Sequence, residues 1–70
     1  MEKLQFELTK DHIELIKLLK FMNIVSSGGE AKMVVEEGMV SVNGEKENRK
    51  RLKLKKGDKV TFNKYQIEII

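Results

Sequence analysis

The dipeptide Asn43-Gly44 narrows the fold of this chain more than any other feature of its sequence. Asn-Gly is the strongest short hairpin signal, because a type I′ turn requires a positive φ at both central residues. Val40 and Val42 alternate with a serine immediately before it, which is the pattern of a half-buried strand. The dipeptide therefore predicts a β-hairpin in the second half of the chain.

The segment after the hairpin combines positive charge with alternating apolar residues. Six of the ten residues from 47 to 56 are lysine or arginine, and Leu52 and Leu54 lie between them. A solvated basic face is the simplest interpretation, but the alternation indicates that one side of the segment faces the core. We expect residues 51–55 to be the strand that returns from the hairpin, with both leucines directed to the core. Alternate side chains would then point outward about 7 Å apart, in a row that contains Arg49, Arg51, Lys53 and Lys55.

A strand and a helix are expected in the first third of the chain. Residues 4–8 alternate apolar and polar side chains, which predicts a first strand. Asp11 stands three residues before Glu14, the spacing of a capping box, and an apolar stripe begins at Ile13. We expect a helix from there to residues 22–23.

A second, shorter helix is expected over residues 28–37. Ser27 and Glu30 have the capping-box spacing, and Gly38 supplies a stop signal. Ala31 begins a short apolar face and is small enough to allow the first helix to approach closely.

Two more strands complete the pattern. Residues 56–58 and 63–65 have turn composition, Val60 and Phe62 alternate between them, and residues 67–70 close the chain. The order is strand, helix, helix, then three or four strands, which predicts the α+β class. No repeat or linker divides the chain, so we expect one domain over residues 1–70.

The small size of the chain limits how it can be stabilised. Seventy residues bury only about 60% of the surface that the unfolded chain exposes. Without cysteine, neither a disulfide nor a thiolate metal site can support the fold. The first residues contain no apolar run long enough for a signal peptide or a membrane span, so the cytoplasm is the expected location.

Charge is segregated along the sequence. Residues 1–45 contain five basic and eight acidic side chains, whereas residues 46–70 contain nine basic and three acidic ones. The first part has a net charge of −3 and the second of +6. Such asymmetry indicates an anionic partner, most often a nucleic acid.

Residues suited to catalysis are scarce. His12 is the only histidine, there is no cysteine, and the serines have no base spaced to activate them. We expect His12 to lie in the first turn of the first helix with a surface or capping role. Adjacent Glu36 and Glu37 would point about 100° apart on a helix and cannot share a reacting atom. The chain is predicted not to be an enzyme, and no cofactor, metal or small-molecule substrate is expected.

Ser27, Gly28 and Gly29 allow two interpretations. They lack the further glycines or the Lys-Ser/Thr of a nucleotide loop. The bare amides of a helix start could receive one backbone phosphate. Alternatively, the glycines only permit a tight turn between two helices.

From residue 27 to residue 44 the sequence SGGEAKMVVEEGMVSVNG, with the later pair Gly57-Asp58, resembles the RNA-binding domain named after ribosomal protein S-four. The similarity extends over about residues 13–62, and the whole chain most resembles the short stand-alone bacterial members of the YbcJ and YaaA kind. The positions that match the family pattern are Ser27, Ala31, Lys32, Val34, Val35, Gly38, Val40, Val42, Asn43, Gly44, Gly57 and Asp58.

The resemblance implies the αL motif, in which two packed helices lie against a small, curved antiparallel sheet that serves to bind structured RNA. It also implies that the start of the second helix and nearby basic residues contact the RNA. Transferred position by position, the expected contacts are Ser27, Lys32 and Asn43, with Lys46, Arg49, Lys50, Arg51 and Lys53 nearby. The helix amides of Gly28 and Gly29 and the charge of Lys55 complete this predicted set.

Two positions depart from the family pattern. The arginine that follows the capping serine in the family is Gly28 here, and the family's Arg-Leu-Asp at the first helix is replaced by residues 14–16, Glu-Leu-Ile. Any phosphate contact at the second helix would then depend on bare amides and Lys32. More of the binding would shift to the basic row of residues 49–55.

The leading hypothesis is a monomeric, non-enzymatic protein that binds structured RNA, ribosomal or transfer RNA, through backbone contacts. Shape and phosphate positions would dominate, since A-form RNA exposes its base edges poorly in the deep groove. The three phenylalanines fit core positions and Tyr65 is expected to pack, which argues against a single-strand binder. The alternative is a protein-interaction adaptor whose basic strand docks on an acidic partner.

Overall fold

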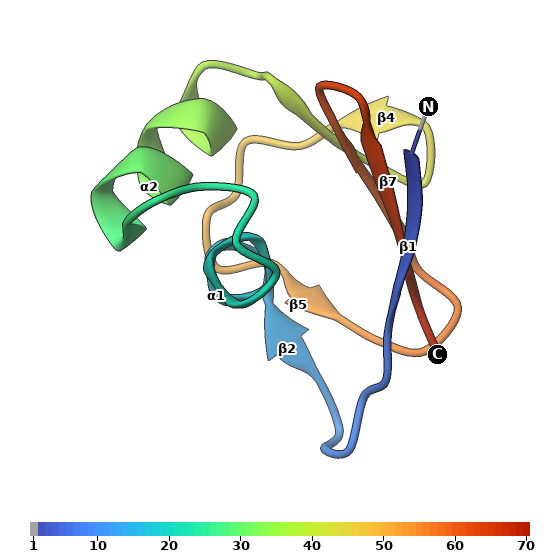
Figure 1. The fold of residues 1–70 in the computed structure, drawn as a ribbon. Coiled ribbons are helices and arrows are strands. Elements are labelled where there is room, and N and C mark those ends of the chain that lie inside the picture. Colours follow the sequence, from blue (N-terminus) through green and yellow to red (C-terminus); the bar gives the residue numbers. More distant parts are fainter. Residues whose placement is uncertain (1) are drawn as a thin grey trace.

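The computed structural model describes residues 2–70, in which two short helices lie on one side of a sheet (Figure 1). In chain order the elements are β1 (Glu2–Phe6), β2 (Ile13–Glu14), α1 (Leu15–Phe21), α2 (Gly28–Glu36), β3 (Val40–Val42), β4 (Glu45–Lys46), β5 (Lys53–Leu54), β6 (Lys59–Phe62) and β7 (Tyr65–Ile69). Every element predicted from the sequence has a counterpart here, although several boundaries and pairings differ.

The larger sheet has five strands in the order β1-β7-β6-β3-β4, and β2 pairs with β5 in a separate two-stranded sheet. Neighbours among β3, β4, β6 and β7 run antiparallel. β1 runs parallel to β7, because it comes from the opposite end of the chain and no hairpin dictates its direction. The sheet is therefore mixed, which corrects the expectation of a wholly antiparallel one.

The core lies between the larger sheet and the two helices. The side chains with no exposed surface are Leu15, Leu18 and Leu19 of α1, Ala31 and Val35 of α2, and Val40, Leu54 and Val60 of the strands. No polar or charged residue is buried anywhere in the described part of the chain. Since the core is entirely apolar, the charged residues are all available at the surface.

The start of α1 differs from the prediction. The helix begins at Leu15 rather than near Ile13, and no side chain caps it. Its free amides are satisfied by the backbone of the basic segment: the N–H of Leu15 donates to the carbonyl of Leu52 at 2.9 Å, and the N–H of Ile16 donates to that of Lys50 at 3.3 Å. A tertiary contact thus replaces the cap that Asp11 was expected to supply.

The hairpin at Asn43-Gly44 is confirmed. Asn43 has a φ of 53° and Gly44 a φ of 88°, the positive values that a type I′ turn requires. The returning strand is β4, which covers only two residues. The expectation that residues 51–55 return from this turn is wrong, because the strand within them, β5, pairs with β2 instead.

Replacing Gly44 with valine should destabilise the fold. A β-branched residue resists a φ of 88°, so we expect the free energy of unfolding to fall by about 2 kcal/mol. Urea unfolding measures the change. Gly29→Ala is the matched control, because Gly29 lies in α2 and only the Ser27 hydroxyl oxygen is near an added Cβ, at 3.8 Å; alanine should preserve or raise stability. Equal losses in both variants would contradict the turn.

Candidate nucleic-acid interface

The amino end of α2 is closed by side chains of the chain itself. Ser27 is the N-cap, and its hydroxyl oxygen accepts a hydrogen bond from the N–H of Glu30 at 3.1 Å. The Glu30 carboxylate in turn accepts from the N–H and the hydroxyl of Ser26, at 2.7 and 2.8 Å. The predicted capping by Ser27 is confirmed, although Glu30 bonds the residue before the cap rather than the cap itself.

Glu30 places a negative charge at the amino end of α2, where the sequence predicted a contact with a phosphate. The hydrogen bonds from the backbone and then the side chain of Ser26 lower the pKa of the Glu30 carboxyl. The ionised carboxylate interacts favourably with the positive end of the helix dipole. A phosphate at this place would have to compete with it.

Gly28 and Gly29 are ordinary helical residues. Neither has a positive φ, and a Cβ added at Gly28 would meet no atom within 4 Å. The left-handed residue between the two helices is Asn23, with a φ of 58°. The turn therefore does not require either glycine, and a side chain at Gly28 would meet no neighbouring atom.

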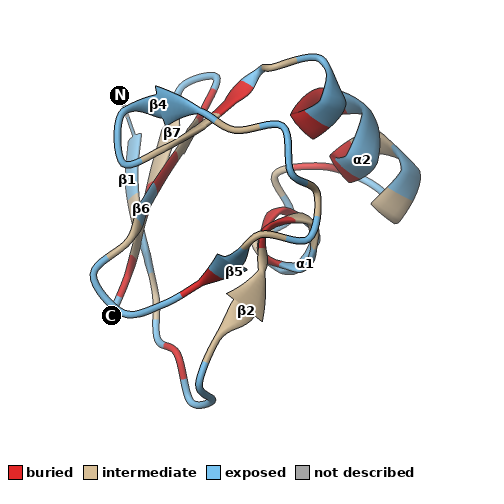
Figure 2. Cartoon of the chain, turned by 180° about the vertical axis from the view of Figure 1, so that it is seen from behind, coloured by how far each residue is buried: buried red, intermediate tan, exposed pale blue. Residues whose placement is uncertain are grey.

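The basic segment between β4 and β6 is folded, but it is not one regular strand. Leu54 is fully buried and Leu52 half-buried, so the predicted inward direction of both leucines is confirmed. Only residues 53–54 are in strand conformation, and residues 50–51 form a turn. The predicted row of four charges along one strand is therefore wrong. Alternation of apolar and polar residues indicates which side chains are buried, but not whether the backbone pairs continuously with another strand. Figure 2 shows the segment between β4 and β5, in which exposed and half-buried residues are mixed, crossing from the sheet toward the helices.

Arg49 is neutralised within the segment. Its guanidinium donates to both carboxylate oxygens of Glu47, from Nε at 2.7 Å and from Nη2 at 3.0 Å. The hydrogen bond lowers the pKa of Glu47 and raises that of Arg49. A phosphate that binds Arg49 must therefore displace or share this carboxylate.

Two lysines lie at the carboxyl end of α2. Lys50 Nζ is 3.6 Å from Glu36 Oε1 in an exposed ion pair. The Lys46 side chain passes close to Gly38, so that a Cβ on this glycine would lie 3.9 Å from Lys46 Cδ. The helix dipole favours positive charge at this end. The predicted residues are thus divided between the two ends of α2 and the segment around β5.

In the described part of the chain, the remaining basic residues of the predicted set form no ion pair within 4.0 Å, although Lys53 lies across the strand pair from Glu14. Among residues 2–70, the ion pairs within 4.0 Å are those of Arg49 and Lys50 alone. The predicted basic residues that are exposed and outside these pairs are Lys32, Lys46, Arg51, Lys53 and Lys55.

Two exposed methionines near these charges were missed from the sequence. Met33 is 51% exposed and follows Lys32 on α2, and Met39 is 52% exposed just after the helix. The sequence contained a signal for the exposure of Met33, because this residue falls outside the apolar stripe of the helix that begins at Ala31. The surface of α2 therefore combines charge with polarisable apolar area.

Asn43 links two turns. Its side-chain N–H donates to Asp58 Oδ1 at 3.1 Å, and its side-chain oxygen accepts from the N–H of Lys59 at 3.0 Å. The other carboxylate oxygen of Asp58 accepts from the N–H of Lys55 at 2.8 Å. The Asn-Gly and Gly-Asp pieces of the sequence pattern are therefore in direct contact. This gives Asn43 a structural role, while its predicted contact with RNA stays a prediction.

Other candidate residues have ordinary surroundings. His12 precedes β2 rather than lying in α1, which corrects its expected place. Tyr65 opens β7 and is half-buried, with Lys64 Nζ 5.6 Å from its ring centroid. Over residues 2–70, no three His, Cys, Asp or Glu side chains are grouped to hold a metal ion, and neither helix could cross a membrane.

Comparison with known proteins identifies the family. The family model of the S4 domain matches residues 6–70. This chain belongs to the S4 domain family. It is 39% identical over 59 residues to the protein named "Putative RNA-binding protein YbcJ" of Escherichia coli (strain K12), a match that spans 84% of both chains. The "Uncharacterized protein YbcJ" of Shigella flexneri matches with the same identity and coverage.

The solution structure of YbcJ from E. coli has the same fold. It is described as revealing an αL motif involved in RNA binding, and it matches this S4 domain with a TM-score of 0.73 and 39% identity. The match covers 94% of this chain and 85% of the other. The sequence resemblance, the α+β class and the αL motif are confirmed.

The contact between Asn43 and Asp58 can be tested by a double-mutant cycle. Asn43→Ala and Asp58→Ala should each destabilise this S4 domain, and the double variant should lose less than the sum. We expect a coupling free energy of about 1 kcal/mol from urea unfolding. Asp11→Ala combined with Asn43→Ala is the control, and its effects should add. Additive losses for Asn43 and Asp58 would show that their bond contributes nothing.

Glu30 should make the stability of the S4 domain depend on acid pH. Its lowered pKa means that ionised Glu30 stabilises the fold; this contribution is complete above about pH 4.3 and is lost as the pH falls through the folded-state pKa. Glu30→Gln should therefore be less stable than the natural chain at pH 7, and the difference should shrink as the pH falls through the lowered folded-state pKa of Glu30.

A control for this pH dependence lies at the other end of the same helix. Glu37→Gln removes the same charge at the carboxyl end of α2, where a carboxylate is unfavourable. It should cost no stability at pH 7. A loss in Glu30→Gln that is the same at pH 7 and in acid would contradict the proposed role of the charge.

Proposed function

We propose that this S4 domain is a non-enzymatic RNA-binding protein that acts in the cytoplasm without a cofactor. It binds structured RNA, of the ribosomal or transfer class, mainly through contacts with backbone phosphates. Membership of the S4 domain family and the description of YbcJ as RNA-binding support the class of partner. The exposed charges around β5 support the place of binding.

The observation that carries the proposal is the way Arg51, Lys53 and Lys55 are held. All three are exposed and outside the ion pairs of the described chain. Between them, fully buried Leu54 fixes the backbone against the core and against Ile13 of β2. Because this backbone is already ordered, binding does not incur the loss of conformational entropy that ordering a flexible segment would cause.

The aromatic residues favour structured RNA as the partner. A protein for single strands stacks bases on open aromatic rings, but Phe62 is buried and Tyr65 is half-buried beside Lys64. Phe21 is exposed, yet its ring packs edge-to-face on Phe6 with centroids 5.2 Å apart. Contacts with the phosphates and the shape of an RNA helix suit this surface better.

The other predicted residues make smaller contributions under this proposal. Lys32 adds exposed charge in the middle of α2, and Lys46 adds it near the carboxyl end of the helix. Arg49 and Lys50 bind phosphate only by leaving or sharing their carboxylate partners. At Ser27, Gly28 and Gly29 a phosphate has to compete with the Glu30 carboxylate for the start of α2. Asn43 acts by holding the turn before Lys59.

Charge reversal around β5 tests the proposal. Lys53→Glu and Arg51→Glu should each weaken binding of a labelled transfer RNA at least about tenfold at low salt, since one phosphate contact becomes repulsive. Fluorescence anisotropy measures the affinity, and circular dichroism should show an unchanged fold. Lys10→Glu makes the same charge change in the loop between β1 and β2 and should have little effect.

A salt series tests whether phosphate contacts hold the RNA. The logarithm of the association constant should fall linearly with that of salt concentration, and Lys53→Gln should reduce the slope by roughly 0.7 to 0.9. Equal effects of Lys53→Glu and Lys10→Glu would refute the proposed surface. If neither transfer nor ribosomal RNA binds even at low salt, the proposed function is wrong, and an acidic protein becomes the partner to seek.

A further inference from the structure

The first strand has a free edge. β1 is the terminal strand of the larger sheet, and within residues 2–70 it pairs with β7 alone. The backbone groups of its even-numbered residues, and of Leu8 just after it, face β7. The N–H of Leu8 donates to the carbonyl of Ile70 at 2.7 Å, and the carbonyl of Phe6 accepts from the N–H of Ile70 at 2.9 Å. Backbone groups alternate along a strand, so those of Lys3, Gln5 and Glu7 point away from the sheet.

We propose that two copies of this chain associate through this edge, with their β1 strands antiparallel and centred on Gln5. Gln5 then lies opposite Gln5 of the second copy, and the outward backbone groups of residues 3, 5 and 7 meet in hydrogen-bonded pairs. The two sheets join into one of ten strands. This reversible dimer replaces the monomer expected from the sequence.

The charges along the edge fit this register. Lys3 lies opposite Glu7 of the second copy, and two-fold symmetry repeats the pair at the other end. All three outward residues, Lys3, Gln5 and Glu7, are exposed in the single chain. Opposite charges directly across two strands attract, and like charges repel. A register shifted by two residues loses both ion pairs, and parallel pairing in register sets lysine against lysine.

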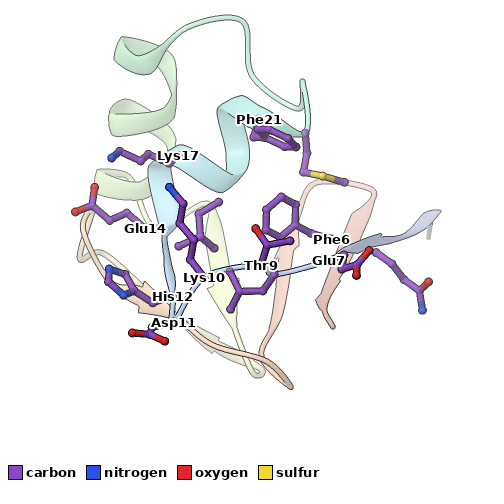
Figure 3. A pocket seen from close by; sticks show the side chains of 13 residues that line it. Phe6, Glu7, Thr9, Lys10, Asp11, His12, Glu14, Lys17 and Phe21 are labelled. Atoms are coloured by element: carbon purple, nitrogen blue, oxygen red, sulfur yellow. The ribbon is translucent and has the colours of Figure 1, made fainter.

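The apolar side of the edge is complementary in the same register. Leu4 and Phe6 are half-buried on the helix side of the sheet, and the pairing sets Leu4 opposite Phe6 of the second copy. Beside them Phe21 is 69% exposed, the largest value among the large apolar residues of the described chain. In Figure 3 the rings of Phe6 and Phe21 lie together at one end of a groove of about 940 Å³.

The symmetry of the pairing covers this groove. An antiparallel pair has its two-fold axis perpendicular to the sheet, so the helices of both copies lie on the same face. The two grooves, each bounded by β1, the loop after it and α1, then face each other across the axis. Phe21 of each copy gains apolar neighbours that the single chain does not provide.

The dimer does not depend on the proposed function. β4, which leads into the basic segment, forms the opposite edge of the sheet from β1. None of Arg51, Lys53 and Lys55 belongs to β1 or lines the groove beside it, so these charges lie outside the proposed interface. Loss of RNA binding in Lys53→Glu would leave association unchanged, and loss of association would leave the affinity of each copy for transfer RNA in place.

Charge exchange at the edge tests the proposal. Sedimentation velocity over a concentration series should show a monomer–dimer equilibrium for the natural chain. Lys3→Glu and Glu7→Lys each set like charges opposite one another twice, and should each raise the dissociation constant at least about tenfold. The double variant, with both substitutions, restores opposite charges and should return the constant close to its original value.

Controls make each outcome decisive. Glu37→Lys changes net charge as Glu7→Lys does, but at the end of α2, and should leave association unchanged. Circular dichroism should show that all variants remain folded. A chain that stays monomeric up to millimolar concentration would overturn the proposal. So would a dimer that Lys3→Glu does not weaken, or one that the double variant fails to restore, since another surface would then hold the copies together.

Discussion

The burial of Leu54 is the interaction on which the charged surface depends. This side chain has no exposed area, and its strand pairs with Ile13 and Glu14 immediately before α1. The same segment supplies the carbonyls that satisfy the first amides of α1. One apolar anchor therefore positions the basic segment, caps the first helix and closes the core between helices and sheet. Loss of Leu54 would affect all three, whereas loss of a neighbouring lysine affects only the surface.

The contact between Asn43 and Asp58 explains why distant parts of the sequence pattern occur together. Fifteen residues separate them, yet the amide of Asn43 and the carboxylate of Asp58 join the β3–β4 turn to the turn that follows β5. The carboxylate also accepts from the N–H of Lys55. The end of the basic segment is thus held by a polar link, and its middle by Leu54. The Asn-Gly and Gly-Asp pieces of the family pattern therefore stabilise the fold, in addition to any part they take in binding.

Local signals predicted much of this fold, and long-range pairing was where they failed. The turn at Asn43-Gly44, the cap at Ser27 and the burial of Leu54 depend on neighbouring residues, and all three were predicted correctly. The partner of β5 and the parallel direction of β1 depend on contacts between distant segments, which alternation does not encode. The start of α1 failed for the same reason, since its amides bond a segment some 35 residues away.

The acidic residues decide which part of the candidate site keeps its positive charge. Charge counting in the sequence treated the basic residues as free, but Glu47 engages Arg49 and Glu36 engages Lys50. Glu30 adds a carboxylate at the start of α2, where Gly28 stands in place of the family arginine. These acids offset charge at the two ends of α2 and at Arg49, and among the described residues none of them forms an ion pair with Arg51, Lys53 or Lys55. Under the proposed function, a phosphate therefore gains most beside Arg51, Lys53 and Lys55, and the first turn of α2 becomes a secondary contact.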